Sequence, residues 1–226
     1  MDITPIEPLP LQNTILYIRG GKNMNIYRSI LLLSLLAATL LPSVAEVDTI
    51  TFCDSLPPKE GGWSDRHILP LFDPTMGELL RVDLSVDLVV TQDFQFENEG
   101  PAGATVDVDS VFELSITMPD SSNITAAATS SISEDLAGFD GEVDFSGPSG
   151  RTIKGLASTG SVAEEYLELA AFVASIPDET INLPARALAN SKTQLSGNTV
   201  SRISSLVGSK VCVTYTYDAD AGGEGR

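Results

Sequence analysis

The most reactive side chains in this sequence are one histidine, His67, and two cysteines, Cys53 and Cys212. A serine hydrolase needs a histidine that accepts the proton of its nucleophile, and no Gly-x-Ser-x-Gly sequence marks such a nucleophile here. We therefore expect His67 to be a surface or half-buried strand residue without a partner. One histidine and two cysteines are also too few for a four-ligand zinc site. These residues predict no catalytic, cofactor-binding or metal site.

Carboxylates are the other groups that could do chemistry, and 31 Asp and Glu residues stand against 13 Lys and Arg residues. A glycosidase needs two carboxylates at a fixed separation, but among so many acids a suitable pair arises by chance. The sequence has no glycine-rich phosphate loop and no Asp-x-Asp-x-Asp-Gly loop with a closing glutamate. We expect no enzymatic activity and no cofactor, with Ca²⁺ as the one cation that the acidity leaves open.

The negative charge lies almost entirely after residue 45. Residues 1–45 hold three basic and two acidic side chains, so the formal charge of −18 leaves −19 for the remainder. Such a surface repels nucleic acid and anionic lipid headgroups. The hydrophobic fraction of 42% is nevertheless high enough to bury a core. Among partners, this favours cell-envelope or extracellular proteins or glycans and excludes nucleic acid.

Residues 24–45 have the pattern of a secretory signal peptide. Arg28 precedes an uncharged apolar run, Pro42 ends it, and small residues lead to a cleavage site after Ala45. The run is shorter than the roughly 20 residues that a spanning helix needs, so we expect no membrane span after cleavage. An uncleaved N-terminal anchor is the alternative. Residues 1–23 are interpreted as an over-extended start before Met24.

Strand signals dominate the rest of the chain. Apolar residues occupy every second position in segments 82–90 and 210–218, and also in 105–118 except at Ser110, and a fourth alternating segment spans 48–54. Segment 161–172 is interpreted as partly extended rather than helical. The pattern predicts an all-β, antiparallel β-sandwich, a single domain over residues 46–218, preceded by a signal-peptide helix and followed by a flexible polar tail at 219–226. Shorter strands are expected at 67–72, 94–97, 123–129, 142–145, 151–154 and 179–183.

The two cysteines occupy equivalent places in the first and last predicted strands. Each lies on the threonine-bearing face, opposite the apolar one. If these strands pair, Cys53 and Cys212 meet on the outer face of a sheet and close nearly the whole domain into one loop. An even number of cysteines in an exported chain favours this disulfide, and two unpaired thiols are the alternative.

Several landmarks together resemble the choice-of-anchor E domain family. The most specific are the turn at 72–79 (FDPTMGEL) and the closing strand at 211–217 (VCVTYTY), with DFSGPSG at 144–150 between them. The resemblance covers roughly residues 48–217. It implies an exported prokaryotic surface protein that ends in one of several anchoring signals, with no activity established for the domain. No such signal follows Tyr217, so we expect release from the cell, retention through a partner, or a missing last segment.

These patterns together predict an exported, non-enzymatic β-sandwich at the cell surface or in the medium, with a structural or adhesive role. A glycan- or calcium-binding module is the alternative. Trp63 is interpreted as packing at one end of the sandwich, with a sugar-stacking platform as the other reading. Asn123 begins an Asn-Ile-Thr sequon and is the expected glycosylation site if the host glycosylates exported proteins.

Overall fold

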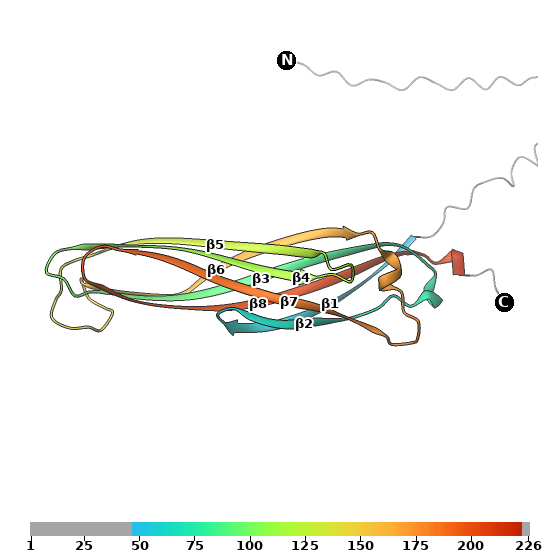
Figure 1. Cartoon of the computed structure of the whole chain (residues 1–226), viewed down its shortest axis with the longest axis horizontal. Helices are drawn as coiled ribbons and strands as arrows, with labels where there is room; N and C mark the ends of the chain where they lie inside the picture. The colour runs from blue at the N-terminus through green and yellow to red at the C-terminus, as the bar shows by residue number, and fades with distance from the viewer. Residues whose placement is uncertain (1–46, 223–226) are drawn as a thin grey trace, which may run out of the picture. The chain divides into compact units, whose positions relative to one another are not determined.

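The computed structural model describes residues 47–222, and these form a β-sandwich (Figure 1). The predicted signal peptide and its cleavage site after Ala45 lie outside the described residues. Three short 3₁₀ helices accompany the strands: η1 (Pro74–Met76), η2 (Leu169–Phe172) and η3 (Asp220–Gly222). The eight strands are β1 (Val47–Glu60), β2 (Trp63–Pro70), β3 (Glu78–Asn98), β4 (Ala104–Thr117), β5 (Asn123–Leu136), β6 (Gly150–Tyr166), β7 (Thr180–Leu195) and β8 (Thr199–Asp218).

The strands form two four-stranded antiparallel sheets with the orders β1-β8-β3-β6 and β2-β7-β4-β5. The chain crosses between the sheets at every connection except the β4–β5 hairpin. This eight-stranded, two-sheet arrangement is that of a jelly roll. The all-β sandwich expected from the sequence is therefore confirmed.

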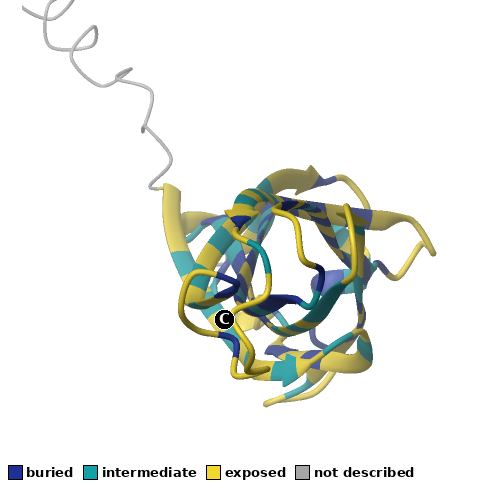
Figure 2. Cartoon of the chain, turned by 90° about the vertical axis from the view of Figure 1, so that its left-hand side faces the viewer, coloured by how far each residue is buried: buried dark blue, intermediate teal, exposed yellow. Residues whose placement is uncertain are grey.

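Period-two alternation determines which side chains meet between the sheets. The even-numbered residues from Val82 to Val90 on β3 are fully buried, and so are Val211, Val213 and Tyr215 on β8. The buried residues lie between the sheets and the exposed ones on their outer faces (Figure 2). The apolar faces that the sequence predicts for segments 82–90, 105–118 and 210–218 are thus confirmed as the core.

The core has two apolar parts of unequal size, and polar side chains lie between them, from the buried Gln92 and Ser110 to the exposed Ser191. The larger part contains Val90 on β3 and Phe112 on β4, and the smaller contains Phe94 and Val108 on the same strands. A group that we call the polar belt occupies the level between these pairs. It consists of Gln92, Ser110, Ser130, Ser191 and Ser205.

The polar belt joins the two sheets through side-chain hydrogen bonds. The Gln92 amide nitrogen donates to Ser110 Oγ at 3.0 Å and to Ser205 Oγ at 3.3 Å, while its carbonyl oxygen accepts from Ser130. Ser110 Oγ lies 2.8 Å from Ser191 Oγ. Gln92 and Ser110 are almost completely buried, so these bonds satisfy groups that would otherwise lose water without compensation.

Several short predicted strands prove to be parts of longer ones. The expected strand at 94–97 is the end of β3, and the one at 179–183 is the start of β7. The segment 161–172 is extended only to Tyr166, where β6 ends and the turn leading to η2 begins.

The expected strand at 142–145 is wrong. This segment belongs to the loop between β5 and β6, and Phe145 has a φ of 60°, a left-handed conformation that no strand accommodates. The segment instead forms a loop whose Phe145 contacts Glu97 on β3 and Arg202 on β8. Within residues 47–222, no helix is long and apolar enough to cross a membrane.

Candidate functional site

Cys53 and Cys212 form a disulfide, which confirms the pairing expected from their positions in the first and last strands. They face each other directly in the β1–β8 ladder and are separated by 159 residues in the chain. The hydroxyls of Thr51 and Thr214, the next pair on the same face, form a hydrogen bond with 2.8 Å between their oxygens. The disulfide therefore lies on the outer face of one sheet, and it closes almost the whole described domain into one covalent loop.

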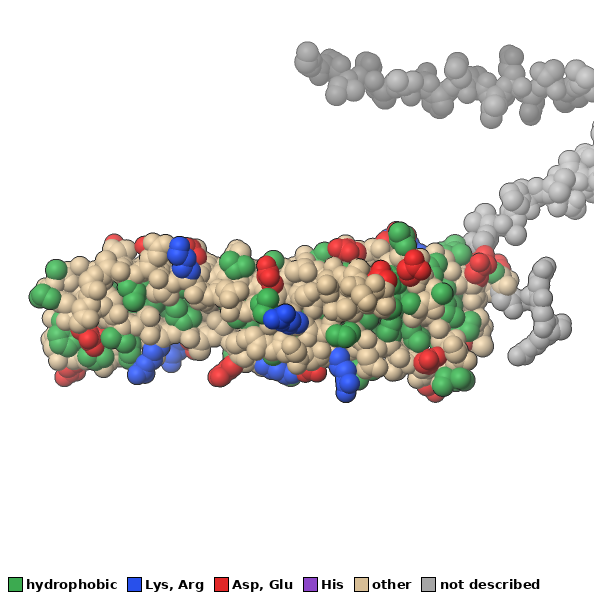
Figure 3. Space-filling model, in the orientation of Figure 1, with side chains coloured by type: hydrophobic (Ala, Val, Ile, Leu, Met, Phe, Trp, Pro, Cys, Tyr) green, Lys and Arg blue, Asp and Glu red, His purple; other side chains and the backbone are tan. Residues whose placement is uncertain are grey.

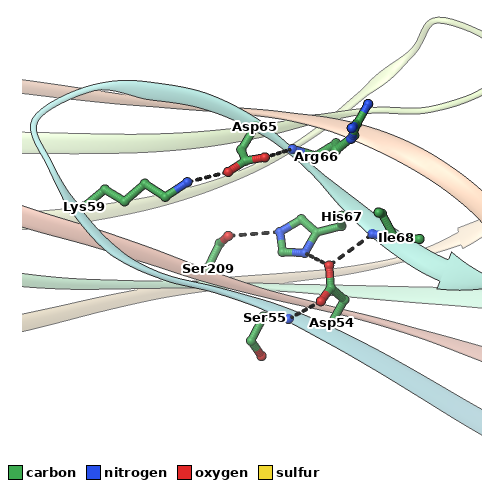
Figure 4. Close-up of polar contacts among 8 residues, drawn as sticks. All are labelled: Asp54, Ser55, Lys59, Asp65, Arg66, His67, Ile68 and Ser209. Atoms are coloured by element: carbon green, nitrogen blue, oxygen red, sulfur yellow. Dashed lines mark hydrogen bonds and ion pairs between the residues drawn. The ribbon is translucent and has the colours of Figure 1, made fainter.

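Three polar side chains from β1, β2 and β8 form a cluster (Figure 4), and one of them, Asp54, follows Cys53 in β1. His67 on β2 contacts Asp54 on β1 through Nδ1, at 3.1 Å from Oδ2, and Ser209 on β8 through Nε2, at 2.9 Å from Oγ. The backbone N–H of Ile68 also donates to Asp54 Oδ2, at 3.0 Å. We call these three side chains the Asp54–His67–Ser209 cluster. It joins three strands that belong to both sheets.

The cluster holds its histidine in the neutral form. His67 is completely buried, and this burial lowers the pKa of its imidazole, although the Asp54 carboxylate acts in the opposite direction. In a neutral ring one nitrogen donates and the other accepts. We assign Nδ1–H as the donor to Asp54 and Nε2 as the acceptor from the Ser209 hydroxyl, because the carboxylate can only accept.

This connectivity is that of a Ser-His-Asp relay, but its burial gives it a different role. A nucleophilic serine must be reachable by the substrate carbonyl and must face donors for the oxyanion. Ser209 is only 5% exposed and His67 is fully enclosed between the sheets. The cluster therefore acts as a hydrogen-bonded connection between strands, and it offers a substrate no path to its hydroxyl.

The sequence-based expectation for His67 was wrong on both burial and partners. The alternation contained the necessary signal, since His67 shares its face with the buried Leu69, and Asp54 shares the inner face of β1 with Phe52. A histidine and an aspartate on inner faces require polar partners. Which strands bring them together could not be read from local pattern.

The sequence predicted that Trp63 covers an end of the sandwich, and this was wrong. The Trp63 side chain, on β2, lies against Val207 near the middle of β8. Its indole N–H donates to the Val207 carbonyl at 2.9 Å, and the Lys59 ammonium lies 5.4 Å from the ring centre. The ring is half-buried. These contacts fix the β1–β2 turn against β8 and explain the tryptophan as packing.

Asn123 is exposed at the first position of β5, and its side-chain oxygen accepts from the Thr117 hydroxyl at 2.8 Å. Thr125, the last residue of the sequon, is also exposed. The sequon is therefore accessible on the outer face of its sheet. Glycosylation itself stays a prediction.

No family model matches this chain, and no curated protein matches it. Among solved structures, a particle of infectious bursal disease virus aligns with 79% of this chain and 38% of its own, at 10% identity and a TM-score of 0.15. The structure of the Gx strain of the same virus aligns with 76% and 41%, at 12% identity and a TM-score of 0.12. The chain thus spans about two fifths of those chains. The choice-of-anchor E resemblance stays a prediction.

Proposed function

We propose that this chain is an exported, non-enzymatic structural or adhesive domain of the choice-of-anchor E type, acting at the cell surface or in the medium. The Cys53–Cys212 disulfide carries the proposal. Disulfides that close a whole domain form and persist in oxidising compartments, and they are rare where thiols are kept reduced. The signal-peptide pattern before Glu46 supports the same location.

The chemistry of the described surface supports a role in contact rather than in catalysis. Acidic and basic side chains are scattered among polar and apolar ones over the face seen in Figure 3. The relay-like Asp54–His67–Ser209 cluster is sealed between the sheets. A protein of this kind acts through its outer faces and loops, with its acidity keeping it soluble.

The proposal is tested in the cells that produce the chain. We expect that deleting the gene weakens attachment of cells to one another or to a surface, and that the purified chain restores it when added outside. Ser209→Ala should restore attachment as well as the unchanged chain does, because the hydroxyl has a structural role only. Loss of restoration by a folded Ser209→Ala variant would contradict a non-enzymatic role. Unchanged attachment after deletion would contradict the adhesive role.

A further inference from the structure

The loop between β5 and β6 carries oxygen ligands at alternate positions. Asp140, Glu142, Asp144 and Ser146 are all exposed, and together with Gly141 and Gly147 they line one hollow. The Asp140 and Asp144 carboxylates each accept a backbone N–H two residues further on, through Oδ1. Among the described residues, Oδ2 of neither makes a hydrogen bond. An acidic loop of this kind is a solvated surface feature unless something else in the structure requires a cation.

Glu97 is the residue whose burial calls for a cation. It lies at the end of β3 under the loop and is completely buried. Its Oε2 accepts from the Phe145 N–H at 2.7 Å, which aims the carboxylate at the loop. Its Oε1 is buried and has no hydrogen-bond partner. A buried carboxylate with an unsatisfied oxygen is costly unless a cation or a proton compensates it.

The local backbone keeps the loop directly over this carboxylate. A Cβ on Gly150 would lie 2.2 Å from the Ser146 nitrogen, so only glycine permits this approach of loop to sheet. The Thr152 hydroxyl also donates to the Phe145 carbonyl at 3.0 Å. The segment that carries Asp144 and Ser146 is therefore held against the sheet at the point where Glu97 is buried.

No protein cation neutralises Glu97 in the described part of the chain. The Arg202 guanidinium lies 4.8 Å from the centre of the Phe145 ring, in a cation–π contact. Of the ion pairs among described residues, none involves Glu97. A cation from solution is the simplest group that would compensate Glu97 and the loop carboxylates together.

We propose that this loop binds Ca²⁺, with Glu97 Oε1 as the buried ligand and the carboxylates of Asp140, Glu142 and Asp144 as the outer ones. All these donors are oxygens, which suits a hard cation, and Ca²⁺ accepts six to eight of them in flexible geometry, whereas Mg²⁺ demands a near-ideal octahedron. In residues 47–222 no three acidic, histidine or cysteine side chains converge on one point. Binding therefore requires the exposed loop carboxylates to turn toward Glu97.

The expected affinity is that of an extracellular module, with a dissociation constant of about 10⁻⁴–10⁻³ M. The inference does not depend on the proposed adhesive role, since it concerns binding alone. Calorimetric titration of the purified chain, stripped with a chelator, should give saturable binding of one Ca²⁺, with much weaker binding of Mg²⁺. Ca²⁺ should also raise the midpoint of thermal unfolding.

Substitutions test whether Ca²⁺ binds at this loop or is only attracted by the overall negative charge of the chain. Glu97→Gln keeps an oxygen for the Phe145 N–H but removes the charge, and it should weaken Ca²⁺ binding at least about tenfold. Asp144→Asn keeps an oxygen for the Ser146 N–H but removes the charge of an exposed residue, and it should weaken binding similarly. Asp109→Asn is the matched control, because Asp109 is an exposed acid on β4 that accepts from Ser131, and it should leave binding unchanged.

Three results would overturn the proposal. One is no saturable Ca²⁺ binding by the unchanged chain. Another is unchanged affinity in Glu97→Gln, which would mean that Glu97 is not a ligand. The third is an equal loss of affinity in Asp109→Asn and Asp144→Asn, which would assign any binding to net charge.

Discussion

His67 is the one histidine in the chain, and the structure makes it a titratable connection between three strands. Its imidazole is buried and neutral, donates to Asp54 and accepts from Ser209. Protonation would replace the acceptor nitrogen with a second donor. The Ser209 hydroxyl would then have to turn away, and a positive charge would lie between the sheets.

We expect this histidine to make stability depend on pH. Burial lowers the pKa of His67 in the folded chain, while the unfolded chain titrates near the ordinary value of about 6.5. The unfolded state therefore binds more protons, and the contribution of His67 is complete above pH ~6.5 and falls as the pH drops toward the folded pKa. Urea unfolding midpoints measured from pH 8 to pH 5 should show this decline.

His67→Gln provides the comparison, since the glutamine side chain also offers a donor nitrogen and an acceptor oxygen but does not titrate. It should lose the part of the pH dependence that lies just below pH ~6.5, above the range where most carboxylates titrate. An equal decline in both proteins would contradict the assignment of that slope to His67.

At the level of strands, the polar belt is the feature that ties the two sheets together. Gln92 comes from β3, Ser205 from β8, and Ser110, Ser130 and Ser191 from the strands of the opposite sheet. A buried network that is fully satisfied can specify one arrangement of strands, because a slip in register would leave its members without partners.

We expect Gln92→Ala to lower the free energy of unfolding by about 2–4 kcal/mol, because it opens a cavity and leaves the buried Ser110 hydroxyl with fewer partners. Gln95→Ala is the control on the outer face of the same strand, where Gln95 is only half-buried, and its effect should stay within about 1 kcal/mol. Chemical denaturation of both variants measures the difference. Equal effects would contradict a special role for the belt.

The sequence predicted the strands whose two faces differ clearly and missed those whose faces do not. Segments 82–90 and 211–217 alternate apolar and polar residues, so one face had to be buried. The second half of β7, with the sequence NSKTQ at 190–194, is polar on both faces, and its Ser191 belongs to the polar belt. Its strand conformation comes from pairing with β4, which no local pattern reports.

The candidate sites also differ in whether local sequence patterns could predict them. The cysteine pair was predictable because strand parity placed both residues on one face and their register then made them meet. The Asp54–His67–Ser209 cluster and the contact of Glu97 with the β5–β6 loop depend on segments distant in the chain. They became visible only once the order of the strands was known.

For the molecule as a whole, the central claim is an exported sandwich whose first and last strands are covalently joined. Closing a loop of this length stabilises a domain by roughly 4–5 kcal/mol if the unfolded-chain entropy dominates. If the chain is exported as proposed, such a link also holds the first and last strands together where no cellular chaperone refolds the domain. The acidic surface and the disulfide therefore suit the same environment.

The most direct measurement is mass spectrometry of the material that the producing cells export, digested without reduction. The account predicts a mature chain that begins at Glu46, together with a peptide pair joined through Cys53 and Cys212. Exported material with both thiols free, or a chain found only inside the cell with residues 24–45 still attached, would contradict it.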